Sequence, residues 1–316
     1  MSLFAVVLAA GEGKRLASGR AKVLHEAGGR PLIDHVLAAL APLSPDRVVV
    51  VAGHRREQVE AHLGGGARIV VQDPPRGTGD AVALALRALP GEGDVLVLSG
   101  DVPLIRAQTL ERLVAERRRT GAAAALVTAE LPDGGAYGRI VRDGAGDVAA
   151  IVEARDAGAS QRAIREVNAG TYAFDVVDLA GVIGKVKAEN AQGEYYLTDA
   201  VRLLVQRGRK VIALTLSDPD EMAGVNSRGD LAEVNGLLAR RVVAELQASG
   251  VTVLDPATTW VEPGCRVGRD TVLEPGVHLR GGCVIGEGCV VGANSVLEGT
   301  TVPDRTVVAP LSRQWP

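Results

Sequence analysis

Small and basic residues alternate in a stretch near the start of the chain, LAAGEGKRLASGRAKVLH, which runs from Leu8 to His25. Gly11 and Gly13 have no side chains, so backbone N–H groups there can approach a phosphate closely. Arg15 and Lys22 add positive charge, and a guanidinium group can donate several hydrogen bonds to one anion. The stretch predicts a loop that binds nucleotide phosphates; from these residues alone, a solvated basic loop after a strand is the alternative.

Two common phosphate-binding motifs do not fit this loop. A Walker A loop has a glycine five residues before its Gly-Lys pair and Ser or Thr after it, but Gly13-Lys14 is followed by Arg15, and Leu8 holds the earlier position. A dinucleotide-binding fingerprint needs a third glycine where Leu16 stands. The loop is therefore interpreted as a nucleotide-binding loop of another type.

Asp101 is the best candidate for a metal ligand. It follows the apolar run Val95–Leu98, which should form a buried parallel strand. Ligands of parallel sheets bind beyond the carboxyl ends of the strands, and Mg²⁺ often takes one or two protein carboxylates together with substrate phosphates. The alternative is an ordinary residue at a helix start before Pro103.

The elements that must position these residues alternate along the first two thirds of the chain. Four short runs, LFAVVLAA, DRVVVVAG, ARIVVQ and DVLVLSGD, are continuously apolar, as strands buried on both faces should be. Between them lie the helical patterns Pro31–Ala41, Arg55–Leu63, Thr78–Leu89 and Leu104–Arg119. This alternation predicts an α/β fold with a Rossmann-like, doubly wound, mostly parallel sheet.

The last part of the chain has a six-residue period. An aliphatic residue recurs at Val261, Val267, Leu273, Leu279, Ile285, Val291 and Leu297, and four residues after each comes a smaller side chain. Seven hexads in register indicate a parallel β-helix, with about three coils if each coil takes three hexads. The phase slips by one at Val302.

An amphipathic helix should join the two parts. Apolar residues between Asp230 and Gln247 fall on one helical face, and Gly250 follows as a stop. The expected domains are residues 1–227, a connecting helix 228–250 and a β-helix 251–316.

Composition narrows the function class. Apolar residues make up 47% of the 316 residues, enough for a sizeable core, and the net charge of −3 gives no support to a nucleic-acid binder. The first apolar run is short and has no charged region ahead of it, so neither a signal peptide nor a membrane span is expected. Three cysteines, Cys265, Cys283 and Cys289, do not make a disulfide framework, and free thiols are expected. A cytoplasmic protein is the starting expectation.

Several motifs follow one another in a known order. LAAGEGKRL with AKVLH, QDPPRGTGDAV, LSGDVPL, YGRIV, IVEARDA, EVNAGTYAF, NAQGEYYLTDAV and GVNSRGDL occur in this sequence. Together they resemble the uridyltransferase domain of the bifunctional N-acetylglucosamine-1-phosphate uridyltransferase/glucosamine-1-phosphate acetyltransferase family, over residues 3 to about 300. The resemblance implies a left-handed β-helix for the hexads and assembly of the chain as a homotrimer.

The implied reaction joins UTP and N-acetylglucosamine 1-phosphate into UDP-N-acetylglucosamine and releases pyrophosphate, with Mg²⁺ as cofactor. The attacking phosphate has a second pKa of about 6, so no general base is required. The resemblance assigns catalysis to Arg15, Lys22 and Asp101, and metal binding to Asp101 and Asn226. It assigns the nucleotide side to Leu8, Ala9, Ala10, Gly11, Gly13, Gln72, Gly77 and Thr78. It assigns the sugar side to Ser99, Gly100, Gly138, Glu153, Asn168 and Tyr196.

The chain departs from the family pattern in two respects. Ser99 stands where the family usually has tyrosine, so any contact from an aromatic ring is lost. The family's β-helix is much longer, and its acetyltransferase residues have no matching positions here, so uridyltransferase without acetyltransferase activity is expected. The alternatives are a nucleotidyltransferase for another sugar 1-phosphate or for dTTP, and a regulator that binds nucleotide sugars without turnover.

Overall fold

The computed structural model describes residues 1–315 and groups the chain into two compact units. One unit holds residues 1–25 and 32–227, and the other holds residues 26–31 and 228–316. The short hairpin of β2 (Glu26–Ala27) and β3 (Arg30–Pro31) was expected in the first domain. It belongs with the second unit because it contacts helix α8 (Arg228–Ala248), where Gly28 N donates to Asn235 Oδ1 at 2.9 Å.

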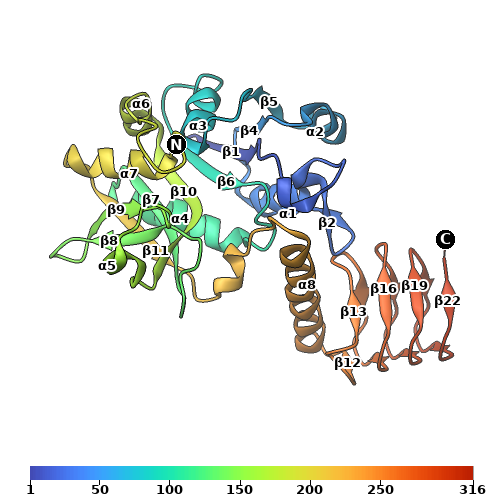
Figure 1. The fold of residues 1–316 in the computed structure, drawn as a ribbon. Coiled ribbons are helices and arrows are strands. Elements are labelled where there is room, and N and C mark those ends of the chain that lie inside the picture. The colour runs from blue at the N-terminus through green and yellow to red at the C-terminus, as the bar shows by residue number, and fades with distance from the viewer. Residues whose placement is uncertain (316) are drawn as a thin grey trace. The chain divides into compact units, whose positions relative to one another are not determined.

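A nine-stranded sheet forms the centre of the first unit (Figure 1). In spatial order its main path runs β11 (Val211–Thr215), β7 (Ala124–Glu130), β10 (Glu166–Asp175), β6 (Asp94–Ser99), β1 (Leu3–Ala9), β4 (Arg47–Ala52) and β5 (Arg68–Val71). Strands β8 (Arg139–Arg142) and β9 (Val148–Val152) extend it beside β10. Only β10 runs antiparallel to its neighbours on the main path, so the expectation of a mostly parallel sheet is confirmed.

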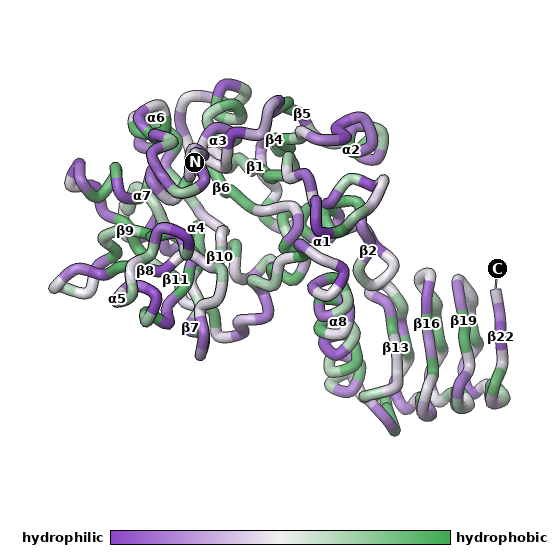
Figure 2. Tube along the Cα trace, viewed as in Figure 1, coloured by the Kyte–Doolittle hydropathy of each residue, from purple (hydrophilic) through white to green (hydrophobic). Residues whose placement is uncertain are grey.

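Helices cover both faces of this sheet. They are α1 (Leu32–Leu40), α2 (Arg56–Leu63), α3 (Thr78–Leu86), α4 (Ala107–Thr120), α5 (Ala159–Arg162), α6 (Val176–Ile183) and α7 (Leu197–Gln206). Alternate residues of β6 enter different cores: Val95 and Val97 pack with residues of α3, α6 and α7, whereas Leu96 and Leu98 pack with residues of α1, α2 and α4. Burial on both faces explains why the middle of the strand, Val95–Leu98, is entirely apolar, and β6 is mostly green in Figure 2.

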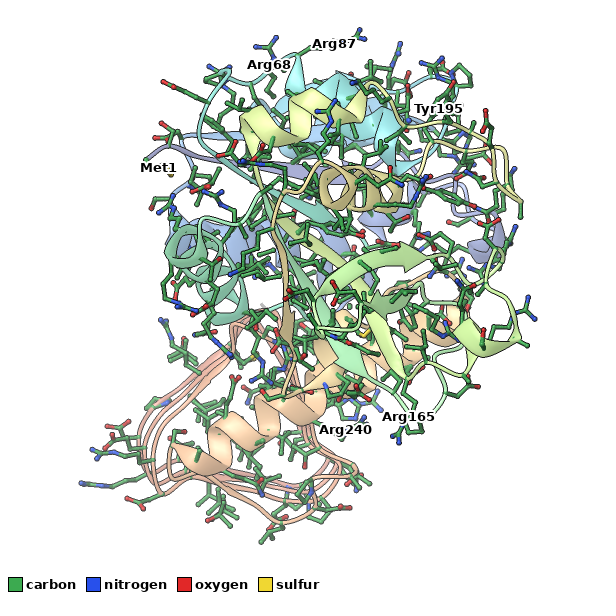
Figure 3. The ribbon with its side chains drawn as sticks, turned by 90° about the vertical axis from the view of Figure 1, so that its left-hand side faces the viewer. Met1, Arg68, Arg87, Arg165, Tyr195 and Arg240 are labelled. Atoms are coloured by element: carbon green, nitrogen blue, oxygen red, sulfur yellow. The ribbon has the colours of Figure 1, made fainter. Side chains whose placement is uncertain are left out.

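The second unit contains α8 and a parallel β-helix. Its strands form three sheets: β12 (Thr252–Val253), β15 (Val272–Leu273), β18 (Val290–Val291) and β21 (Val307–Val308); β13 (Trp260–Val261), β16 (His278–Arg280), β19 (Val296–Glu298) and β22 (Arg313–Gln314); and β14 (Arg266–Val267), β17 (Val284–Ile285) and β20 (Thr301–Val302). Figure 3 looks along the stack, so successive coils overlay one another. This is the short parallel β-helix that the hexads predict, in the left-handed form that the family resemblance implies.

The hexad positions form the interior of the β-helix. Val261 pairs with Leu279, and Leu279 pairs with Leu297; all three side chains are buried, at 1%, 0% and 0% exposure. The predicted slip is also present, because Ile285 pairs with Val302 and the period then continues to the buried Val308. Repeated burial of one aliphatic side chain per hexad is what holds the stack together.

No helix within residues 1–315 combines the length and the apolar composition that crossing a membrane requires.

Candidate active site

A cavity of about 570 Å³ opens where β1 and β6 end in the first unit. Most of the site residues that the sequence predicted are in its lining: Leu8, Ala9, Ala10, Gly11, Gly13, Arg15, Lys22, Gln72, Gly77, Thr78, Ser99, Asp101 and Asn226. These residues come from five separate segments of the chain. The carboxyl ends of parallel strands bring them together, as expected for a doubly wound sheet.

The glycine-rich loop follows β1 and closes over Lys22. Gly13 has φ of 64°, a left-handed conformation that favours glycine, and it precedes the short helix η1 (Lys14–Leu16). A Cβ atom on Gly13 would lie 3.0 Å from Cβ of Lys22. The buried Leu16 anchors the loop, so its glycines stay at the mouth of the cavity.

Three polar groups meet at the floor of the cavity. The ammonium group of Lys22 pairs with the carboxylate of Asp101 and lies 2.7 Å from Oδ1 of Asn226. The side chains of Lys22 and Asp101 are only 12% and 19% exposed. A backbone hydrogen bond also joins the segments that carry Asp101 and Asn226, because Val225 N donates to the carbonyl of Asp101 at 2.9 Å. The sequence separates Lys22 from Asn226 by 204 positions.

The oxygens of Asp101 and Asn226 suit a hard divalent cation. Within residues 1–315 no group of three or more His, Cys, Asp or Glu side chains gathers at one point, so no all-protein metal cage is present there. A carboxylate and an amide oxygen beside a phosphate-binding loop are instead the partial ligand set that Mg²⁺ uses when substrate phosphates and water complete it. The ammonium of Lys22 already places one positive charge between the same two oxygens.

Arg15 differs from Lys22 in having no side-chain partner among residues 1–315. Its side chain lines the cavity, is exposed, and makes no hydrogen bond or ion pair with any residue in 1–315. Its neighbour Lys14 is paired with Glu12 at 2.6 Å, which raises the pKa of Lys14 and lowers that of Glu12, chiefly through the hydrogen bond between them. The guanidinium of Arg15 is therefore available to an anion that enters the cavity.

The amide nitrogen of Gln72 makes two hydrogen bonds within the protein. The side chain is 3% exposed, and Nε2 donates to the carbonyl of Gly77 at 2.9 Å and to Oδ2 of Asp80 at 2.8 Å. Gln72 was predicted to lie on the nucleotide side of the site. The structure limits what its amide can do there, because an amide nitrogen has two hydrogens and both have partners inside the protein.

Gly77 and Thr78 connect the cavity to a second segment. A Cβ atom on Gly77, whose φ is 106°, would lie 2.6 Å from the carbonyl oxygen of Tyr195. Oγ1 of Thr78 accepts a hydrogen bond from Leu197 N at 3.0 Å. The start of α3 therefore packs directly against the backbone that leads into α7, and only glycine fits at position 77.

Four residues predicted for the sugar side, Gly138, Glu153, Asn168 and Tyr196, form a separate cluster. Gly100, Gly138, Glu153, Asn168 and Tyr196 are absent from the cavity lining, whereas Ser99 is in it. The carbonyl of Gly138 accepts from Asn168 N at 2.9 Å, and Oε1 of Glu153 accepts from Oγ1 of Thr198 at 3.0 Å. The cluster reaches the cavity at Ser99, since a Cβ atom on Gly170 would lie 3.8 Å from Oγ of Ser99.

Burial sets the protonation of this cluster. Burial raises the pKa of Glu153 above its usual range, against the hydrogen bond from Thr198 that lowers it. Burial, together with the charges of Asp156, Glu153 and Glu194, raises the pKa of Tyr196 to about 12. The tyrosine hydroxyl is therefore a neutral hydrogen-bonding group near neutral pH.

Glu194 also lines the cavity and was not singled out from the sequence. Its backbone is fixed by Asn190, whose Nδ2 donates to the carbonyl of Glu194 at 2.6 Å. The signal was present, since Glu194 belongs to the GEYYLTD motif, but no spacing rule places this motif beside the first loop. Glu12, Lys14, Val23, Pro75 and Ala81 complete the lining.

Comparisons with known proteins match two parts of the chain to protein families. The family model of the MobA-like NTP transferase domain matches residues 5–168, and that of the bacterial transferase hexapeptide (six repeats) matches residues 264–299. A protein named bifunctional protein GlmU from Thermobifida fusca is 49% identical over 312 residues, covering 96% of this chain and 64% of that protein. A protein of the same name from Streptomyces avermitilis is 48% identical over 288 residues, covering 89% of this chain and 60% of that protein.

The chain thus spans less than two thirds of the length of these relatives. Among solved structures, a chain described as a glucose-1-phosphate thymidylyltransferase from Bacillus anthracis superposes with a TM-score of 0.60. That match covers 75% of this chain and 95% of the other at 20% identity, so it supports the fold alone.

Proposed function

The chain belongs to the MobA-like NTP transferase family, and we propose that it transfers a uridylyl group from UTP to N-acetylglucosamine 1-phosphate, forming UDP-N-acetylglucosamine and pyrophosphate. The observation that carries the proposal is the meeting of Lys22, Asp101 and Asn226 in one cavity with a glycine-rich loop. The relatives named GlmU support the choice of nucleotide and sugar.

The reaction requires that the two substrates be aligned and that the negative charge on their phosphates be neutralised. An oxygen of the sugar 1-phosphate attacks the α-phosphorus of UTP, the bond from that phosphorus to the oxygen bridging the α- and β-phosphates breaks, and its electron pair leaves with pyrophosphate. The attacking phosphate has a second pKa of about 6 and is largely ionised near neutral pH, so the protein need not remove a proton. Catalysis then depends on holding two anions in line.

The residues of the cavity divide this work between them. The N–H groups of the Gly11–Gly13 loop and the guanidinium of Arg15 would bind the triphosphate. Asp101 and Asn226 would hold a divalent cation, for which Mg²⁺ is the candidate, and such a cation neutralises charge on the phosphates when bound. Lys22 would turn from Asp101 toward the phosphates when the nucleotide enters, because a phosphate offers its ammonium group a stronger anionic partner.

The remaining groups would recognise the two substrates. The amide oxygen of Gln72 can accept a hydrogen bond from the base, since its Nε2 hydrogens are already used. The cluster of Gly138, Glu153, Asn168 and Tyr196 would hold the sugar, with the carboxylate of Glu153 accepting from its hydroxyl groups.

A pyrophosphate-release assay tests this proposal. UTP with N-acetylglucosamine 1-phosphate and Mg²⁺ should give turnover that stops when the cation is chelated. Glucose 1-phosphate and dTTP serve as the comparison substrates. Faster turnover with either would assign the site to another nucleotide sugar, and binding of UDP-N-acetylglucosamine without turnover of any pair would identify a regulator.

Three further properties stay predictions. The absence of acetyltransferase activity is tested by measuring CoA release from acetyl-CoA and glucosamine 1-phosphate. Release of CoA would contradict this prediction, and the match to the transferase hexapeptide model is an argument for that result. A trimer formed through the β-helix is tested by the mass in solution of the full chain and of residues 1–227. A cytoplasmic location is supported by the three free thiols of Cys265, Cys283 and Cys289.

A further inference from the structure

The sequence does not determine which end of the Gln72 amide, the NH₂ group or the oxygen, faces the ligand. An amide side chain can donate with its nitrogen and accept with its oxygen, so a glutamine in a base pocket can in principle satisfy several bases. Which end faces the ligand depends on what the rest of the protein does with the other end. In this chain the amide nitrogen of Gln72 has two hydrogen-bond acceptors, a backbone carbonyl and a carboxylate.

Two acceptors surround one end of the amide. The carbonyl of Gly77 and Oδ2 of Asp80 lie 2.9 and 2.8 Å from Nε2 of Gln72. A backbone carbonyl and an ionised carboxylate can only accept, so this end must be the NH₂ group, and its two hydrogens are both used. The oxygen is left to bond whatever occupies the cavity, which Gln72 lines at 3% exposure.

Asp80 is itself held in place. It lies in the first turn of α3, its side chain is 13% exposed, and Oδ1 accepts from Nη2 of Arg76 at 2.8 Å. The guanidinium of Arg76 lies 6.0 Å from the ring centre of Tyr195, a residue labelled in Figure 3. One carboxylate oxygen thus bonds to the arginine while the other remains directed at Gln72. Asp80 is not itself in the cavity lining.

We propose that Asp80 is a positioning residue that fixes the Gln72 amide with its oxygen toward the base and thereby makes the site select bases that carry a ring N–H. Uracil and thymine have a hydrogen on N3, which this oxygen can accept. The N3 of cytosine has no hydrogen and is an acceptor, so two acceptors would face each other. The inference rests on the proposed function, because it names how the same site selects its nucleotide.

The choice has an energetic consequence. A glutamine that could turn would offer NH₂ to cytosine at little cost. In this site, turning it would place the amide oxygen against two acceptors and leave all three without a hydrogen. Sites that hold a buried polar group in one orientation reject the wrong partner strongly, because mismatched groups lose their hydrogen bonds in a place that water does not reach.

The test measures dissociation constants of UTP and CTP by calorimetry, together with kcat/KM for both, in the wild-type protein and three variants. The wild-type protein should prefer UTP. Asp80→Ala should reduce the preference about tenfold, because one of the two acceptors that orient the amide is gone. Asp80→Asn keeps an acceptor of the same size at the same place, so it should retain the preference within about threefold. Glu116→Ala, which removes an exposed carboxylate from α4, is the matched control.

The outcomes separate the two claims. If the wild-type protein prefers UTP and Asp80→Ala prefers it equally, the inference is wrong and the proposed function stands. If Asp80→Ala is unstable, Asp80→Asn still decides, since loss of the preference in that folded variant contradicts the role given to the acceptor. A wild-type protein that does not bind UTP overturns the proposed function and the inference with it.

Discussion

The ammonium group of Lys22 pairs with the carboxylate of Asp101, although the two residues lie on loops that follow different strands, β1 and β6. The same ammonium is 2.7 Å from Oδ1 of Asn226. A divalent cation held by these two oxygens would have to take the place of the ammonium group. Removal of Lys22 and removal of Asp101 should therefore have opposite effects on cation binding.

Asp101→Asn should lower kcat/KM about a hundredfold or more, because the charged ligand to the cation is lost. It should also weaken binding of Mn²⁺, measured by electron paramagnetic resonance in the presence of nucleotide. The melting temperature reports whether the fold is intact. Wild-type activity in this variant would remove Asp101 from the mechanism.

Lys22→Met should also lower kcat/KM by about a hundredfold, since a positive charge on the phosphates is lost. In the protein without nucleotide, however, it should tighten Mn²⁺ binding, because the competing ammonium group is absent. Lys187→Met, at a lysine that is 72% exposed, is the control for loss of one positive charge. Weaker Mn²⁺ binding in Lys22→Met would show that the ammonium does not compete for the site.

Arg15→Ala should reduce kcat/KM strongly while the melting temperature stays within about 1 °C of the wild-type value. The side chain is exposed and has no partner among residues 1–315, so the fold loses nothing when it is removed. Kinetics and thermal unfolding on the same preparation make the comparison. A large loss of stability with normal activity would assign Arg15 to the structure of the loop.

Gly77→Ala should destabilise the protein by about 2 kcal/mol or more, because φ of 106° and the carbonyl of Tyr195 at 2.6 Å both exclude a Cβ atom. The expected fall in melting temperature is about 5 °C. Gly91→Ala is the matched control, since no atom lies within 4 Å of its added Cβ and its φ is not positive. Equal melting temperatures for the two variants would contradict this packing.

Glu153→Gln should change how stability depends on pH. Burial raises the pKa of Glu153, so the folded protein binds that proton more tightly than the unfolded chain does. The resulting stabilisation is complete below the ordinary pKa of 4.5 and is lost as pH rises through the raised value. Glutamine is not ionised, so the melting temperature of the variant should gain on that of the wild type as pH rises from about 4 to about 7. If the melting temperatures of the two proteins changed in parallel with pH, burial would not raise the pKa of Glu153.

Local sequence patterns predicted most of the elements. The runs that became β1, β4 and β6 were visible because most of their positions are buried and therefore apolar. The run that became β5 is equally apolar in sequence, but this strand lies at the edge of the sheet and is only partly buried, so the expectation of burial on both faces was wrong for it. The hexads predicted the β-helix because one inward side chain per strand repeats at a fixed spacing, as Leu273 and Leu279 show. Long-range pairing left no such trace. Nothing local indicates that β10 enters the sheet antiparallel between β6 and β7, or that residues 26–31 fold with α8.

The sequence predicted most of the residues that line the cavity, but not their contacts. Glycine and charge patterns placed Gly13, Lys22 and Asp101 at strand ends, and the order of motifs added Asn226. The ion pair of Lys22, the two acceptors on Gln72 and the position of Glu194 in the lining depend on which side chains meet across the fold. The Lys22 pair and the placement of Glu194 join segments that are far apart in the sequence, whereas the acceptors of Gln72 are only five and eight residues away from it. No periodicity encodes either kind of contact.

The proposed reaction of this cavity joins UTP to N-acetylglucosamine 1-phosphate. Phosphorus NMR of the purified chain with both substrates and Mg²⁺ measures this directly. The account predicts that the two signals of UDP-N-acetylglucosamine and the signal of pyrophosphate grow together in equal amounts, and that Asp101→Asn gives neither product at the same enzyme concentration. Release of inorganic phosphate instead of pyrophosphate, or unchanged spectra with the wild-type chain, would contradict it.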